Sequence, residues 1–505
     1  MRRIEIIRVL RNVGSNGLAL AINVLVGVFL SPFILHRLGD TAFGIWVLIF
    51  SIAGYYGLFD LGIRSSIVRY VSRARANNDW EDASCVISTS LFSYSCIGIF
   101  ALLVTATLSL FMGKFHSISP PFQATARWLL IMVGSAVSLG FPLGVFGGVL
   151  EALQRFELQS SINIASTLIR ALLIVLALTH GYGLLTIAFI TVMLPILSSV
   201  LRALITFRLI PVRLGPAYVR RSTFRQIANY SGFSFIAIVS GRLRFKSDEI
   251  IIGSFLSAAA ITYFNIGGRI VDYAEEVVEA FAQILVPMSS DADAKGETER
   301  LRKICIAGNR FCSFITFPIC SILVILGKSI IEAWVGRRYV AQSYPVLILM
   351  AIPSMLMMAQ SASGRVLFGT SRHRTWSIVM LGEGVLNIAI SILLVRPYGI
   401  VGDALGTAIP LTATMIFFQP GHVCRKLQIP LRTYLVEAYA LPITLCIPVI
   451  LTLLLMKMWF VPHTYAQLAV HLLVVTAVYG GLLFWAFATK RALHFEPMQT
   501  LEPQP

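Results

Sequence analysis

The residues best suited to chemistry in this sequence are ionisable side chains placed inside long apolar runs. In the run 259–287, Arg269, Asp272, Glu276 and Glu279 lie at i, i+3, i+7 and i+10. An α-helix with this spacing carries all four side chains within an arc of roughly 80°. Such acids can hold protons or cations when they face water, and they form ion pairs when they face basic groups. Asp272, Glu276 and Glu279 are therefore candidates for ion coupling or gating. The alternative is that they form structural ion pairs with Arg242 and Lys246 of the run 231–256.

The run 231–256 also carries charges. Arg242, Lys246 and Glu249 share one helical face at i, i+4 and i+7, whereas Arg244 and Asp248 lie on another. A charge at bilayer depth costs at least about 2.5–3.5 kcal/mol unless it is paired or hydrated. Because one helix cannot aim both faces at a single cavity, we expect some of these charges to be paired. Asp248 and Glu249 are further candidates for ion coupling.

Three other runs contain isolated charges. Arg170 lies in the middle of 160–180 with no acid within one turn, so its partner must come from another helix or from a bound anion. Glu383 is the lone acid of 375–395, and a proton carrier, a cation ligand and a satisfied buried acid are equally open. Asp60 and Arg64, at i and i+4, predict a local ion pair at the end of the run 41–63.

Membrane-spanning helices must position these residues. The 505 residues are 57% hydrophobic and 13% charged, with a mean hydropathy of +0.79, whereas about 25% charged is usual in soluble proteins. Apolar runs of this length span a bilayer, where helices satisfy their own backbone. A soluble enzyme and a nucleic-acid-binding protein are excluded. We predict an all-α integral membrane protein with about fourteen transmembrane helices, at 13–35, 41–63, 83–112, 128–150, 160–180, 184–207, 231–256, 259–287, 304–327, 342–364, 375–395, 400–423, 439–460 and 467–488.

Lys and Arg are divided unequally between alternate loops. With the N-terminus in the cytoplasm, 26 of the 41 basic residues fall in cytoplasmic segments and 7 in the opposite loops. This asymmetry predicts that both termini are cytoplasmic, and it accounts for most of the net charge of +17. The basic N-terminal segment lacks a small-residue cleavage site, so we expect a first span there. The seven cysteines show no metal-ligand spacing, and neither a disulfide nor a metal site is expected.

The chain carries a weak internal repeat. A shift of about 216–218 residues places the spans 13–35, 41–63, 160–180 and 184–207 on later spans. We therefore predict two parallel six-helix repeats followed by two extra helices. The expected parts are a cytoplasmic N-terminus (1–12), an N-terminal lobe (13–207), a cytoplasmic linker (208–230), a C-terminal lobe (231–423), two extra helices (439–488) and a cytoplasmic tail (489–505).

Several short motifs resemble the polysaccharide transporter family, which includes the Wzx-type O-antigen flippases and belongs to the MOP superfamily. They are Phe43-Gly44-Ile45-Trp46, Gly57-Leu58-Phe59-Asp60-Leu61-Gly62-Ile63-Arg64, Asp248-Glu249-Ile250-Ile251-Ile252-Gly253 and Tyr263-Phe264-Asn265-Ile266. The resemblance implies a V-shaped MATE-like helix bundle working by alternating access in a bacterial inner membrane. It implies export of an undecaprenyl-diphosphate-linked O-antigen or exopolysaccharide unit, coupled to H+ or Na+, with membrane lipids and other polysaccharide assembly proteins as partners.

A diphosphate cargo would suit basic groups, because Arg and Lys bind phosphate oxygens strongly. The candidates are Arg170, Arg242, Arg244, Lys246 and Arg269. A MATE-type drug/cation antiporter is one alternative. A membrane-embedded glycan polymerase or ligase is another, although the longest outside loops have only about fifteen residues. No catalytic residue, metal, cofactor or nucleotide motif is expected.

Overall fold

The computed structural model is all-helical over the residues that it describes, which are 2–114, 118–227 and 247–489. Arg242, Arg244, Lys246 and most of the predicted span 231–256 lie outside these residues. The chain divides into two compact units. Unit 1 comprises residues 1–265 and 377–407, and unit 2 comprises residues 266–376 and 408–505. The predicted division into two lobes at 208–230 stays a prediction.

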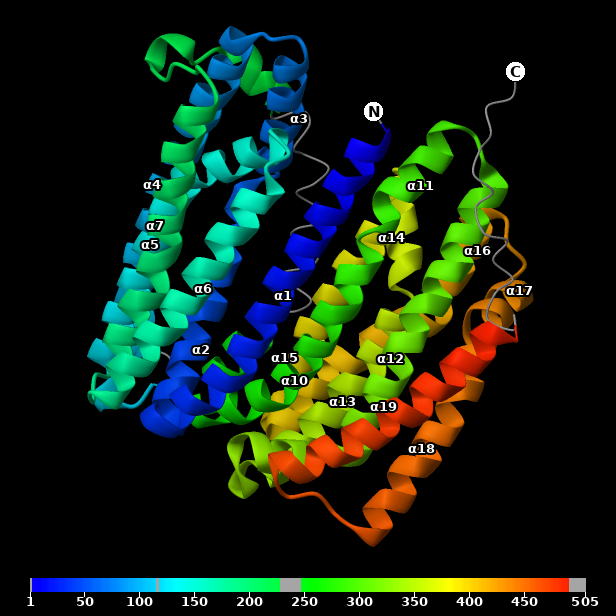
Figure 1. The fold of residues 1–505 in the computed structure, drawn as a ribbon. Helices are drawn as coiled ribbons and strands as arrows, with labels where there is room; N and C mark the ends of the chain where they lie inside the picture. The colour runs from blue at the N-terminus through cyan, green and yellow to red at the C-terminus, as the bar shows by residue number, and fades with distance from the viewer. Residues whose placement is uncertain (1, 115–117, 228–246, 490–505) are drawn as a thin grey trace, which may run out of the picture. The chain divides into compact units, whose positions relative to one another are not determined.

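Unit 1 is built mainly from seven helices along the first 209 residues: α1 (Arg2–Leu38), α2 (Asp40–Tyr55), α3 (Ile63–Ala76), α4 (Trp80–Phe111), α5 (Pro120–Ala152), α6 (Phe156–Thr179) and α7 (Leu184–Leu209). α4, α5 and α7 lie side by side, and α1 packs against α6 (Figure 1). A cluster centred on Ile67, Ile87 and Val149 joins α3, α4 and α5. The unit also holds α9 (Asp248–Phe255), the start of α10 (Ala258–Ala282) and the middle of α15 (Arg374–Ala413).

Unit 2 contains the rest of α10 and α15. Its other helices are α11 (Leu285–Ala294), α12 (Thr298–Val335), α13 (Val340–Ala359), α14 (Ser361–Gly369), α16 (Gln419–Leu427), α17 (Leu431–Leu435), α18 (Leu441–Trp459) and α19 (Tyr465–Ala488). The last two attach through an apolar seam in which Leu326 of α12 meets Val449, Leu453 and Val475. Short π-helical turns, at Thr414–Phe418 and Val436–Ala440, interrupt the helices around α16 and α17.

Eleven helical stretches are long and apolar enough to cross a membrane in the described part of the chain. The expected count of about fourteen is consistent with this number, because one stretch, Arg374–Leu427, has 54 residues and covers two predicted spans. A further predicted span, 259–287, corresponds to the charged helix α10. The protein is therefore a multi-pass membrane protein with an all-α fold.

The stretch around α15 is a helical hairpin rather than one long helix. Gly399 has φ 60° and ψ −141°, a backbone conformation available essentially to glycine alone. The Ser391 hydroxyl donates to the Asp403 carbonyl at 3.2 Å, and a Cβ on Gly406 would overlap Ser391. A continuous helix would separate residues 391 and 406 by about 22 Å. The chain therefore reverses at Gly399, and the two arms of α15 lie against each other.

Close backbone contact also joins α2 to the beginning of α10 in unit 1. A Cβ on Gly44 would overlap the carbonyl oxygen of Ala258, and the Thr262 hydroxyl donates to the carbonyl of Asp40 at 2.7 Å. Small residues permit this approach between helices in a membrane protein. The motif that contains Gly44 therefore lies against the residues that come just before the motif beginning at Tyr263.

Candidate functional site

A group of buried polar side chains gathers around the α15 hairpin in unit 1. We call Asp248, Asn387, Asp403 and Thr407 the hairpin site. Asn387 and Thr407 come from the two arms of α15, and Asp248 is the first residue of α9. The Thr407 hydroxyl lies 3.2 Å and 3.1 Å from the two carboxylate oxygens of Asp248 and 3.2 Å from Oδ1 of Asn387. The hairpin fold therefore brings together residues up to 159 positions apart.

The hairpin site has more acceptor oxygens than donors. Asp248 is 4% exposed and Asp403 is fully buried. The single proton of Thr407 can satisfy only one of the three acceptors around it. Neither carboxylate oxygen of Asp403 has a hydrogen-bond partner among the described residues, and this side chain interacts electrostatically with Asp248 and Glu249. Buried oxygens short of donors suit a proton or a small monovalent cation.

Sequence reasoning found part of this site. It singled out Asp248 and Glu249, both of which are buried, and Glu383, which is buried on the first arm of α15 one turn before Asn387. It missed Asp403, Asn387 and Thr407. The available signal was Asp403 itself, an acid inside the apolar run 400–423. Asn387 and Thr407 carry no such signal, because amides and hydroxyls are common in helices of every kind.

We call Asp272, Glu276 and Glu279 the acidic stripe of α10, which lies in unit 2. Arg269 of the same helix forms ion pairs with two of these acids. Its Nη1 lies 3.5 Å from Oδ2 of Asp272 and 3.5 Å from Oε1 of Glu276. Its guanidinium carbon also lies 4.5 Å from the ring centroid of Tyr273, at cation–π distance. Arg269 is thus already engaged by two carboxylates and a ring.

Glu279 of the stripe and the neighbouring acid Glu275 have partners on α13 and α14. Glu275 accepts a hydrogen bond from Ser354 at 2.6 Å. Glu279 accepts one from Ser361 at 2.9 Å and forms an ion pair with Arg365. The stripe therefore has cationic and hydroxyl partners within unit 2. Arg242 and Lys246, the partners considered from the sequence, lie outside the described residues.

Arg170 lies on α6, half-buried, with no hydrogen-bond or ion-pair partner among the described residues. One turn away, the Thr167 hydroxyl donates to Oδ1 of Asn23 on α1 at 2.8 Å. A bound anion therefore remains a candidate partner for Arg170, as the sequence predicts.

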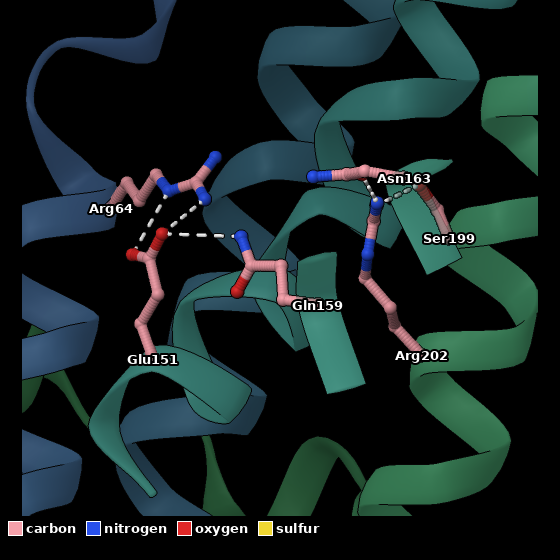
Figure 2. A network of polar contacts seen from close by, with 6 residues as sticks. All are labelled: Arg64, Glu151, Gln159, Asn163, Ser199 and Arg202. Atoms are coloured by element: carbon pink, nitrogen blue, oxygen red, sulfur yellow. Dashed lines mark hydrogen bonds and ion pairs between the residues drawn. The ribbon is translucent and has the colours of Figure 1, made fainter. Parts of the chain in front are cut away.

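The predicted ion pair of Asp60 with Arg64 is replaced by another pairing (Figure 2). Arg64 donates to both carboxylate oxygens of Glu151, through Nη2 at 2.6 Å and Nε at 3.3 Å, while Asp60 accepts a hydrogen bond from Tyr94. The i, i+4 prediction assumed a continuous helix, but Leu61 (φ 50°) and Gly62 (φ 78°) break it. Burial would lower the pKa of the Arg64 guanidinium, and the hydrogen bond and charge of Glu151 raise it instead.

A search of solved structures identifies the fold class. The chain aligns with a structure titled "Lipid II flippase MurJ, inward closed conformation" with a TM-score of 0.72 and 16% sequence identity. The alignment covers 96% of this chain and 99% of that one. At this identity the likeness shows the fold alone.

The family follows from the sequence. The chain belongs to the polysaccharide biosynthesis protein family, whose model matches residues 9–293. It is 20% identical to a Shigella flexneri protein named "Putative O-antigen transporter", over 81% of this chain and 97% of that protein. It is also 20% identical to a Haloferax volcanii protein named "Probable low-salt glycan biosynthesis flippase Agl15", over 76% and 77% of the two chains. The resemblance stated from the motifs is therefore confirmed.

Proposed function

We propose that this protein moves a lipid-linked oligosaccharide across a bacterial membrane. The observation that carries the proposal is family membership over 9–293, together with a relative named for O-antigen transport that aligns over 97% of its length. The cargo we infer is an undecaprenyl-diphosphate-linked O-antigen or exopolysaccharide repeat unit. The chain acts as a transporter and carries out no covalent step.

The charge distribution supports the orientation, and the family supports the inner membrane. Lys and Arg concentrate in the segments that would face the cytoplasm if both termini do. We therefore assign the protein to the inner membrane with cytoplasmic termini. The two six-helix lobes at 13–207 and 231–423 would form the alternating-access halves, with the site near the middle of the membrane.

Transport needs an energy source, and we assign ion coupling to the hairpin site. A proton or Na+ on Asp248 or Asp403 would relieve the shortage of donors around these buried carboxylates. The ion drives transport only if it binds the two access states with different affinities. Glu249 and Glu383 are buried acids of the same unit and belong to this proposal. Asp272, Glu276 and Glu279 have partners within unit 2, so a gating role for them would require those contacts to open.

Basic residues would hold the diphosphate. Arg170 is the best supported because no described residue neutralises it. Arg242, Arg244 and Lys246 remain candidates from the sequence. Arg269 could bind a phosphate only by releasing Asp272 or Glu276, since it is already held by both.

The test is deletion of the gene, followed by extraction of undecaprenyl-linked glycans and staining of the surface polysaccharide. We expect surface glycan to disappear and a complete lipid-linked repeat unit to accumulate on the cytoplasmic face. Re-expression of the wild-type chain should reverse both changes. Normal glycan in a strain without a second flippase, and no trapped intermediate, would overturn the proposal and favour a drug or metabolite exporter.

A further inference from the structure

Arg202, on α7 of unit 1, is a half-buried cation without a carboxylate partner (Figure 2). Its Nη2 donates to Oδ1 of Asn163 at 2.6 Å and its Nη1 to the Ser199 hydroxyl at 3.4 Å. Its Nε is buried and has no hydrogen-bond partner among the described residues. Only two of the five N–H donors of the guanidinium are therefore used, and both go to neutral groups.

The acid that acts on Arg202, Glu151, is held by other residues. Glu151 influences Arg202 electrostatically, but its two carboxylate oxygens accept hydrogen bonds from Arg64. Gln159 also donates to Glu151, at 3.3 Å. Figure 2 shows Gln159 and Asn163, one turn apart on α6, between the Arg64–Glu151 pair and Arg202. An uncompensated half-buried charge is costly unless an anion joins it.

Asn163 belongs to a polar face of α6. Gln159, Asn163, Ser166 and Arg170 lie at i, i+4, i+7 and i+11, which places them within an arc of roughly 60°. All four are half-buried, whereas Leu168, Ile169 and Leu172 on other faces of the helix are exposed. Asn163 and Arg170 are about 10 Å apart along the axis. The face therefore joins two cations that lack an acid partner, Arg202 beside Asn163 and Arg170 further along.

We infer that Arg202, held by Asn163 and Ser199, binds phosphate groups of the anionic headgroup and passes them along the polar face of α6 to Arg170. The inference rests on the proposed function for the identity of the cargo. The end of α7 that carries Arg202 is the one that the charge distribution assigns to the cytoplasm. An arginine offers phosphate oxygens a fork of N–H donors, and the unpaired Nε supplies one edge of it. Arg202 is thus the entry residue and Arg170 the deeper one.

Phosphate oxygens occur in a polyprenyl diphosphate and also in a phospholipid headgroup, so the test must separate the two sources. The probe is radiolabelled farnesyl diphosphate, bound at equilibrium to the purified full-length protein in detergent. Unlabelled farnesyl diphosphate, farnesol and dioleoylphosphatidylglycerol serve as competitors. We expect competition by farnesyl diphosphate alone. Equal competition by phosphatidylglycerol would overturn the assignment to the cargo, and competition by farnesol would overturn phosphate recognition.

Asn163→Asp is the decisive variant, because it gives Arg202 an internal carboxylate where the amide oxygen now lies. If Arg202 has only a structural role, the Asn163→Asp variant should fold normally and bind farnesyl diphosphate as tightly as the wild type. We expect Asn163→Asp and Arg202→Ala each to weaken probe binding by about 10- to 100-fold, the loss of one charged hydrogen-bonded contact. Arg202→Lys should lose less. Arg208→Ala, at an exposed arginine on the same helix end, is the control and should bind like wild type.

Complementation of the deletion strain separates this inference from the proposed function. If the wild-type chain fails to restore surface glycan, the proposed function is wrong. If the wild type restores glycan and Asn163→Asp restores it equally, with unchanged probe binding, the proposed function stands and the role of Arg202 is overturned. Thermal unfolding checks that Asn163→Asp remains folded, so that loss of binding reports on the charge alone.

Discussion

The hairpin site and the α10 stripe both place carboxylates in the hydrophobic part of the molecule, yet they satisfy them differently. On α10, Arg269 lies between Asp272 and Glu276, and Glu279 pairs with Arg365. In the hairpin site, Asp248 accepts hydrogen bonds from hydroxyls, and neither carboxylate oxygen of Asp403 has a hydrogen-bond partner among the described residues. The charge of a paired carboxylate is already compensated, so it needs no ligand. A buried carboxylate with too few hydrogen-bond donors is stabilised when a proton or a cation binds to it. The difference is the reason that we propose ion coupling for the hairpin site and a structural role for the stripe.

The largest effect that this comparison predicts is for Asp248→Asn and Asp403→Asn. Each removes an ionisable acceptor, so we expect ion-dependent transport to fall at least about tenfold, the equivalent of about 1.4 kcal/mol of differential ion binding. Flipping of a lipid-linked oligosaccharide by the purified protein in vesicles, with and without an ion gradient, measures it. Asp403→Asn should leave the protein as stable as wild type or more stable, because it removes a buried charge.

The matched change in the stripe is Glu276→Gln in the same vesicles. The comparison predicts a response to the gradient close to that of the wild type, because this acid already has a partner. If transport by Glu276→Gln no longer responds to the ion gradient while Asp248→Asn and Asp403→Asn still respond, ion coupling belongs to the stripe and not to the hairpin site.

Gly406→Ala tests whether the hairpin site depends on close contact between the two arms of α15. The added Cβ would meet the backbone nitrogen and hydroxyl of Ser391, so the arms must separate. We expect a loss of about 1–3 kcal/mol of stability, as for other overpacked sites. If Na+ is the coupling ion, the unfolding temperature should also rise less on adding NaCl than it does for the wild type. Gly382→Ala, in the first arm with open space around it, is the control. Equal behaviour of the two variants would contradict the close contact.

Arg365→Ala tests the stripe by removing a basic residue instead of an acid. It leaves Glu279 without the arginine that forms an ion pair with it. Both side chains are about one-third exposed, so solvent screening limits the loss of stability to about 1–2 kcal/mol. The double variant Arg365→Ala/Glu279→Ala should recover part of that loss, which a double-mutant cycle of thermal unfolding measures. A cycle with no coupling between the two changes would show that this ion pair contributes nothing to the stripe.

The sequence predicted the fold further than the site. Long apolar runs predict α4 to α7, α18 and α19. The gap between the predicted spans 375–395 and 400–423 coincides with the reversal of the chain at Gly399. Asp403 went unnoticed because a single acid barely changes the hydropathy of 400–423. The pairing of Arg64 with Glu151 joins residues 87 positions apart, and a local spacing rule cannot reach such a distance. Composition and periodicity predict individual helices, whereas the site depends on which helices pack against each other.

The smallest predicted effect is for the stability of Glu276→Gln. Arg269 would keep Asp272 at 3.5 Å and the ring of Tyr273, and the lost contact is itself 3.5 Å long and about one-third exposed. Such pairs contribute about 0–1 kcal/mol. We therefore expect thermal unfolding within about 1 kcal/mol of wild type, with the same stabilisation by NaCl, because the hairpin site is untouched. If the wild type is stabilised by NaCl and this variant is not, the cation binds at the stripe.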